Sequence, residues 1–461
     1  MTACTARLAS RRVETGMRAL KPTKLVYGAA LLVALTACSK DDPILQGKRE
    51  NIRSVLSEED AATLASSQTP AQATPLKLPP VKNNANWSQS PNSPAFRTDH
   101  PALRSTPQLA WSVPIGVGDG NRARITADPV VSSGRVFTLD AHATVTAVST
   151  AGQVIWSQNL VPANESAGDA SGGGLAVEGN TLYVSLGFGL LTALDVTTGN
   201  VKWQQNMRST GTGTPTVVGD LVYVVAGDEI AWALNKNTGR IEWQLVASPD
   251  INNVSGAPAP AVSNKYVVFA FGSGEVQGAF LRGGLRAWDA QVAGQRPGYS
   301  SASIGDITGG PMIAGDKVYI GNHSGRLVAV NLASGKRIWT ALDGPLNQIW
   351  PAGDSIFIVS DRNELIRMSA NDGSRIWART LPFFTKTKPR KQSEIYAHHG
   401  PILAGGRLIV ASNDGKMRFF NPQNGAPLGE VELPGGATTN PVVAGGTLYV
   451  VSSKGQLLAF R

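Results

Sequence analysis

Side chains able to do chemistry are few, and the cysteines are the most informative of them. The chain has two, Cys4 and Cys38, on either side of an apolar run from Leu25 to Ala37. Two cysteines placed in this way build neither a disulfide framework nor a cysteine-based metal site. The thiol chemistry that remains is a modification of Cys38, directly after the apolar run.

The histidines offer no catalytic constellation. Two of them, His398 and His399, are adjacent, so on a strand their side chains point to opposite faces and make a poor metal pair. The sequence also lacks the G-x-S-x-G, H-E-x-x-H and G-x-x-x-x-G-K-[ST] patterns. We therefore predict no catalytic residue, no cofactor and no metal site. The other histidines are His100, His142 and His323.

The apolar run, LVYGAALLVALTA, has 13 residues, whereas a helix needs about 20 to span a bilayer. Basic residues precede the run and small residues end it, a pattern typical of a secretory signal peptide. We predict a signal peptide over residues 1–37, with Met17 as an alternative start.

Leu35-Thr36-Ala37-Cys38 resembles the bacterial lipobox, L-[ST]-[AG]-C, in which the cysteine is acylated and becomes the mature N-terminus. The alternative is a secreted protein with a chance cysteine. Each buried CH₂ of an acyl chain contributes ~0.8 kcal/mol, so lipidation anchors a protein without a spanning helix. Ser39, rather than aspartate, follows Cys38, which predicts the periplasmic face of the outer membrane.

The formal net charge of +9 does not indicate nucleic-acid binding. Residues 1–37 hold six Lys/Arg and one acid, so the rest of the chain has 36 basic and 32 acidic residues, a net charge of +4. A nearly neutral chain gives no diffuse basic surface for DNA or RNA.

Polar, proline-rich sequence follows the lipobox. Residues 38–86 are predicted to be the lipidated N-terminus and a flexible linker, with a short helix over 48–66 as the alternative. Residues 87–106 are predicted to be a lead-in, with Trp87 docked on the domain that follows.

Beyond Pro107 the sequence repeats. The clearest copy is ALDVTTGNVKW, from Ala193 to Trp203, and related copies end at Trp243, Trp339 and Trp377. Short apolar runs bounded by glycine turns predict four antiparallel strands per repeat. The tryptophans that end the repeats lie about 45 residues apart, as in propeller blades, and Leu428 takes the eighth place. They are Trp111, Trp156, Trp203, Trp243, Trp288, Trp339 and Trp377.

Residues 441–461 supply three strands, and residues 107–115 can supply the missing fourth. A ring closed by its first strand leaves no open sheet edge. The predicted fold is therefore all-β: an eight-bladed β-propeller of four-stranded blades over residues 107–461. Each repeat tryptophan is expected to pack against the neighbouring blade.

The A-x-D-x-x-T-G-x-x-x-W copies resemble the quinoprotein-type propeller repeat, and together with the lipobox and the linker the chain resembles the BamB family of outer-membrane lipoproteins. The resemblance implies a non-catalytic scaffold of the β-barrel assembly (BAM) complex that aids insertion of barrel proteins. Implied partners are the periplasmic POTRA domains of the BamA-type insertase and the other BAM lipoproteins. Contact with unfolded outer-membrane proteins stays open.

The same resemblance implies contact residues in two inter-blade loops. Within residues 301–311, Asp306 matches one of the family's paired acids and Thr308 stands in place of the second. In the preceding loop, Ile251 matches an apolar position and Asn253 lies near the family's arginine. The alternative for Asp306 is a turn residue that caps its own backbone.

Two other hypotheses place the chain in different functional classes. Pyrroloquinoline-quinone dehydrogenases share the repeat, but they use a vicinal disulfide, which a mature chain with Cys38 alone does not offer. The other hypothesis is a binding module for peptidoglycan or a periplasmic protein, using residues 382–400. That stretch combines aromatic and basic side chains, which can bind anionic lipid headgroups of a membrane or acidic groups of a partner, and the alternative is a solvated loop. Its candidate contacts are Phe383, Phe384, Lys386, Lys388, Arg390 and Lys391.

Overall fold

The computed structural model describes residues 75–91, 93, 100–209, 213–249, 257–294, 296 and 305–461. The chain divides into two units, Met1–Ser57 and Glu58–Arg461, and every described residue belongs to the second. The predicted signal peptide, Cys38 and the 48–66 segment lie outside the described residues. Within the described ranges, no helix is long and apolar enough to cross a membrane.

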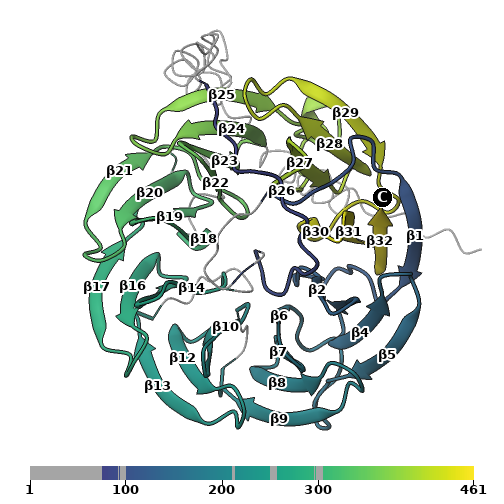
Figure 1. Cartoon of the computed structure of the whole chain (residues 1–461), viewed down its shortest axis with the longest axis vertical. Coiled ribbons are helices and arrows are strands. Elements are labelled where there is room, and N and C mark those ends of the chain that lie inside the picture. The colour runs from purple at the N-terminus through teal and green to yellow at the C-terminus, as the bar shows by residue number, and fades with distance from the viewer. Residues whose placement is uncertain are drawn as a thin grey trace, which may run out of the picture. The chain divides into compact units, whose positions relative to one another are not determined.

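The repeats form eight antiparallel sheets of four strands each, arranged around one centre (Figure 1). We number these sheets as blades 1 to 8. Blade 1 contains β2 (Val130–Ser132), β3 (Arg135–Leu139), β4 (Thr144–Ser149) and β5 (Val154–Asn159), and blade 2 contains β6 (Gly173–Glu178), β7 (Thr181–Leu186), β8 (Leu190–Asp195) and β9 (Val201–Asn206). Blade 3 contains β10 (Thr216–Val218), β11 (Leu221–Val225), β12 (Ile230–Asn235) and β13 (Ile241–Val246), and blade 4 contains β14 (Ala261–Val262), β15 (Tyr266–Ala270), β16 (Glu275–Phe280) and β17 (Arg286–Gln291).

Blades 5 to 8 follow in the same order around the ring, and blade 8 takes its outer strand from the start of the array. Blade 5 contains β18 (Ile307–Ala314), β19 (Lys317–Asn322), β20 (Arg326–Asn331) and β21 (Arg337–Ala341), and blade 6 contains β22 (Trp350–Ala352), β23 (Ser355–Val359), β24 (Glu364–Ser369) and β25 (Arg375–Thr380). Blade 7 contains β26 (His398–Ala404), β27 (Arg407–Ser412), β28 (Lys416–Phe420) and β29 (Pro427–Glu432), and blade 8 contains β30 (Val442–Ala444), β31 (Thr447–Ser452), β32 (Gln456–Phe460) and β1 (Leu109–Pro114).

The ring closes between its first and last strands. β1 pairs antiparallel with β32, and Trp111 lies opposite Ala459. Beyond the ladder, Gln108 and Arg461 exchange two backbone hydrogen bonds of 2.6 and 2.9 Å. The predicted eight-bladed propeller, closed by the N-terminal strand, is confirmed.

The position of a strand within its blade explains its burial pattern. In β7 five of six residues are buried, because the faces of a middle strand pack against both neighbouring blades. In the outer strand β9, exposed and half-buried residues alternate, as expected of a strand with one solvated face. Alternating apolar residues therefore mark outer strands, and near-continuous apolar runs mark the strands inside them.

The repeat motif joins each blade to the previous one. Asp195 accepts hydrogen bonds from the backbone N–H groups of Thr197 and Thr198 at 2.9 and 3.1 Å and so shapes the turn. Gly199 has a φ of +76°, and a Cβ there would lie 2.7 Å from the Trp156 ring. Trp156 in turn donates to the Val196 carbonyl at 3.1 Å. The glycine of the motif in one blade thus packs against the tryptophan of the motif in the preceding blade.

The contact recurs around the ring, and its absence at the eighth position has a physical reason. Leu428 replaces tryptophan there and is 49% exposed. The neighbouring blade 8 joins β32 to β1, two strands from opposite ends of the array, so no glycine turn lies between them for a tryptophan to cover. The recurring pairs are Trp111–Gly152, Trp203–Gly239, Trp243–Gly284, Trp288–Gly335, Trp339–Gly373 and Trp377–Gly425.

The antiparallel order gives the ring two distinct faces. Turns between the second and third strands of a blade lie on the same face as the connections from one blade to the next. We call this the connection face. Turns between the first and second strands, and those with the Thr-Gly motif, lie on the opposite face, which we call the turn face.

The lead-in reaches further over the ring than the sequence indicates. The linker was predicted to extend to residue 86, yet Leu76 and Leu78 already pack against the core of the propeller. Asn84 accepts a 2.7 Å hydrogen bond from Gly445 and donates one of 2.7 Å to Val443. The predicted boundary is therefore too late, because a few apolar and amide side chains in polar sequence suffice to fix the chain.

The lead-in then runs along the inner strands, close to the centre in Figure 1. Trp87 exchanges backbone hydrogen bonds of 2.8 and 2.7 Å with Val131 of blade 1. The side-chain amide of Gln89 exchanges two hydrogen bonds of 2.9 Å with the backbone of Val217 in blade 3. Trp87 is 1% exposed and stacks on Trp350 of blade 6 with ring centroids 6.2 Å apart. The expected docking of Trp87 is thus present, and one short segment joins blades far apart in the sequence.

Candidate functional site

Two adjoining polar cavities lie among the inner strands. The first has a volume of about 250 Å³ and is lined by the lead-in residues Ser90 and Pro91, by Asp306 and Thr308, and by inner-strand residues of several blades. The second, of about 540 Å³, contains His399 and several connection-face residues. Both cavities are lined by Thr126, Asp128, Asn347 and Asn440.

Asp128 is the half-buried acid shared by the two cavities. Its carboxylate accepts hydrogen bonds from the Asn440 backbone N–H at 2.8 Å, from the Asn440 side chain at 3.0 Å and from the Ser90 hydroxyl at 2.9 Å. Burial raises the pKa of Asp128, and these hydrogen bonds oppose the rise. The carboxylate joins the lead-in to blade 8, a role that its sequence context did not indicate.

The structure places Asp306 and Thr308 at the start of β18, on the inner strand of blade 5. Asp306 is 6% exposed, and the Thr308 hydroxyl donates to the Pro345 carbonyl at 2.7 Å. Both line the first cavity rather than standing out from the surface. Ile251 and Asn253 lie outside the described residues, so the predicted pairing of the two loops stays a prediction.

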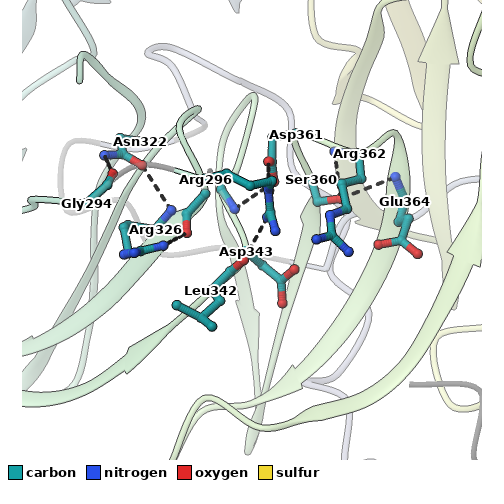
Figure 2. A network of polar contacts seen from close by, with 12 residues as sticks. Gly294, Arg296, Asn322, Arg326, Leu342, Asp343, Ser360, Asp361, Arg362 and Glu364 are labelled. Atoms are coloured by element: carbon teal, nitrogen blue, oxygen red, sulfur yellow. Dashed lines mark hydrogen bonds and ion pairs between the residues drawn. The ribbon is translucent and has the colours of Figure 1, made fainter. Parts of the chain in front are cut away.

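A buried ion pair fixes Arg296, which follows blade 4 (Figure 2). Arg296 donates to the Asp361 carboxylate at 2.7 and 3.1 Å and to the Leu342 carbonyl at 2.7 Å. Both charged side chains are only 9% exposed. Asp361 also accepts the backbone N–H of Gly344 at 3.0 Å.

The ion pair bridges three blades. Arg296 follows blade 4, passes the blade 5 turn at Gly325 and reaches Asp361 in the β23–β24 turn of blade 6. Gly325 has a φ of +96°, and a Cβ there would lie 3.1 Å from the guanidinium. Figure 2 shows the Asn322 side chain reaching Gly294 in the same connection, at 3.4 Å. No sequence signal links Arg296 to Asp361, because the two are 65 positions apart.

The adjacent histidines lie in different environments, as expected for neighbours on a strand. Nε2 of His398 lies 2.7 Å from the Pro382 carbonyl and Nδ1 lies 2.6 Å from the Ser412 hydroxyl. Burial lowers the pKa of His398, while burial and then His398 lower the pKa of His399 to about 4. Within the described ranges no three His, Cys, Asp or Glu side chains gather as a metal site would require.

The predicted basic and aromatic residues form a separate feature. Phe383 and Phe384 are half-buried and pack edge to face with centroids 4.6 Å apart. The four cations, Lys386, Lys388, Arg390 and Lys391, are exposed. The structure thus separates the apolar part of this segment from its charged part.

The eight-bladed ring, with its glycine–tryptophan contacts between blades, defines a quinoprotein-type β-propeller. The profile of the family described as "Outer membrane protein assembly factor BamB" matches residues 141–379 and 386–461. The chain belongs to this family.

Curated relatives support the family membership. The chain is 32% identical over 249 residues to "Outer membrane protein assembly factor BamB" of Escherichia coli (strain K12), and 29% identical over 248 residues to the protein of that name from Alteromonas naphthalenivorans. The matches cover 52% and 51% of this chain. They span 62% and 59% of the relatives' own lengths.

Solved structures share the fold. BamB from Moraxella catarrhalis aligns with a TM-score of 0.63 at 18% identity, covering 77% of this chain and 100% of that one. Quinohemoprotein alcohol dehydrogenase from Comamonas testosteroni aligns with a TM-score of 0.61 at 15% identity, covering 88% of this chain and 84% of that one. At these identities the likeness concerns the fold, which scaffolds and enzymes share.

Proposed function

We propose that the chain is a non-catalytic scaffold lipoprotein of the outer-membrane β-barrel assembly complex. In this proposal it binds the periplasmic POTRA domains of the insertase, beside the other lipoproteins of the complex, and aids the insertion of barrel proteins. The observation that carries the proposal is family membership over more than half of the chain. Acyl chains on Cys38 would confine the propeller to the periplasmic face of the outer membrane.

The contact would lie on the connection face, near β18. A hydrogen bond to the Pro345 carbonyl fixes Thr308, and the ion pair with Asp361 fixes Arg296. A surface fixed before binding loses less conformational entropy when the partner docks. The mechanism is positioning: a rigid ring, held at the membrane, keeps the insertase domains in one arrangement at high local concentration.

A non-enzymatic role also agrees with the available donor side chains. The quinone enzymes that share the repeat use a vicinal disulfide, and the only cysteines here are Cys4 and Cys38. Polar side chains that line the two cavities form hydrogen bonds with each other, as Asp128 does with Asn440 and Ser90. This donor set fits a structural role better than redox chemistry.

The expected effect of Asp306→Asn is a weaker complex with the insertase's purified periplasmic domains. Close charge pairs across interfaces couple by about 1.5 kcal/mol or more, so we expect an affinity loss of at least about tenfold. Isothermal titration calorimetry measures it, with unfolding curves to show that the fold is intact. Asp316→Asn, on the turn face, is the matched control and should bind like the wild type. Equal affinity for all three proteins would remove Asp306 from the contact.

A further inference from the structure

Residues 382–397, between β25 and β26, form a small hairpin on the connection face, which we call the basic hairpin. Phe384 and Ile395 form a β-bridge across it. Thr385 donates its backbone N–H to Glu394 at 3.0 Å, and Tyr396 donates to Phe383 at 2.7 Å. The 3-10 helix η2 (Pro389–Lys391) lies at its tip.

The base of the basic hairpin is fixed to both flanking blades. Asn363, fully buried in the β23–β24 turn, donates its side-chain N–H to the carbonyls of Pro382 at 3.2 Å and Tyr396 at 2.9 Å. Ala397 and Asn413, in the β27–β28 turn, are joined by two hydrogen bonds of 2.9 and 3.0 Å. The hairpin therefore has a defined position relative to both blades.

Its tip concentrates positive charge. Lys386, Lys388, Arg390 and Lys391 lie within six residues and are all exposed, and no ion pair within the described part of the chain engages them. The nearest acid in sequence is Glu394, in the second arm of the hairpin, on the Thr385 hydroxyl at 3.4 Å. The two segments matched by the family profile stop at 379 and resume at 386, so the first arm lies outside the shared sequence.

This arrangement suits an anionic bilayer better than a folded protein partner. Tight protein contacts depend on aromatic or arginine anchors that fill pockets, whereas the hairpin's aromatic rings pack on each other below a tip of solvated cations. Clustered Lys and Arg side chains are attracted to anionic headgroups without a shaped pocket. Ile395, 46% exposed, adds apolar surface beside them.

The place where the lead-in joins the ring agrees with this assignment. The Lys77 carbonyl lies against the β22–β23 turn of blade 6, because a Cβ on Gly353 would be 2.5 Å from it. The basic hairpin follows β25 of the same blade. The lead-in, which continues the lipid-anchored linker of the proposed function, thus contacts blade 6 on the turn face, and the basic tip lies beside the same blade on the connection face. Both belong to one sector of the ring, and the outer edge of that sector lies between them. One lipid anchor combined with a polybasic patch is a recognised pair of membrane signals.

We propose that the basic hairpin binds the anionic headgroups of phospholipid bilayers and turns the sector of blade 6 towards the membrane. The proposal rests on the membrane address given above but not on contact with the insertase. It adds an orientation to the scaffold: the acyl chains hold the ring near the bilayer, and the hairpin selects which edge faces it.

The test uses the mature chain with Cys38→Ser behind a non-lipoprotein signal peptide, so that no acyl chain contributes to binding. Partition into vesicles of phosphatidylglycerol and phosphatidylethanolamine (1:3) is measured by co-sedimentation, with pure phosphatidylcholine vesicles alongside. We expect binding only to the anionic vesicles, weakened by 300 mM salt. Reversal of the four tip cations to glutamate should lower the partition coefficient at least about tenfold.

The matched control reverses four exposed cations on other blades and therefore carries the same net charge. It should bind within about twofold of the wild type. Equal loss in both variants, equal binding to neutral vesicles, or no loss on reversing the tip would overturn the proposal. So would unchanged vesicle binding with loss of a co-purifying periplasmic protein, because the tip would then contact an acidic protein. The control cations are Arg208, Arg240, Arg282 and Lys336.

Discussion

We expect replacement of Trp87 by alanine to lower the free energy of unfolding by about 4 kcal/mol, as is typical of deleting a large aromatic side chain from a core. The ring is 1% exposed and stacks on Trp350, within a buried cluster that includes blades 1, 6, 7 and 8. The indole N–H has no hydrogen-bond partner among the described residues, so we expect the loss to come from packing. Urea unfolding followed by circular dichroism measures it.

The same substitution should release the lead-in before the ring unfolds. Trp87 carries the backbone pairing with Val131, and without its side chain that pairing has little to hold it. We expect limited proteolysis to cut between residues 75 and 106 in Trp87→Ala at protease levels that leave the wild type intact. Trp87→Phe, which keeps an apolar ring, should lose less than half as much stability. Unchanged stability in Trp87→Ala would mean that the lead-in contributes nothing to the ring.

Arg296→Met should cost about 3 kcal/mol, since removing one partner of a buried ion pair leaves the other charge uncompensated. Asp361, which is 9% exposed in the intact pair, would keep the Gly344 N–H as a polar contact but lose the guanidinium. Unlike the Trp87 substitution, this change acts on the connection face. It should also weaken binding of the insertase domains, because position 296, ahead of Asp306 in the chain, loses its attachment to blade 6.

A thermodynamic cycle separates the ion pair from general damage to the fold. In Arg296→Met with Asp361→Asn, the buried charge is gone and the amide oxygen can still accept from Gly344. We expect the double variant to recover most of the lost stability. If the two substitutions instead add, the interaction between Arg296 and Asp361 is not the source of the loss. Thermal and urea unfolding of the four proteins provide the measurement.

The fold could be predicted from the sequence because its determinants are local and repeated. Asp195, Gly199 and the tryptophan of the preceding blade fix one turn and one inter-blade contact, and seven tryptophans with one leucine gave the number of blades. The closing strand followed from counting the strands after Pro441. Even Leu428 fits, since blade 8 offers no glycine turn for a tryptophan to cover.

The candidate site was predictable only in part, because its contacts join residues far apart in the sequence. Asp306 was identified by resemblance, but nothing in its neighbourhood indicated that the carboxylate is buried beside a cavity. Arg296 and Asp361, or Asp128 and Asn440, carry no pattern that pairs them. The length of the ordered lead-in was underestimated for a similar reason. Its polar, proline-rich composition resembles that of a linker, and the inner strands that hold it in place are distant in the sequence.

The central claim is that the chain works as part of the outer-membrane assembly complex. It is tested most directly by co-purification from native envelopes in mild detergent, using a C-terminal tag on the full-length protein and mass spectrometry of what remains bound. The account predicts recovery of the β-barrel insertase and its other lipoproteins in near-stoichiometric amounts. Recovery of a peptidoglycan-bound or other envelope protein, with the insertase absent, would contradict it.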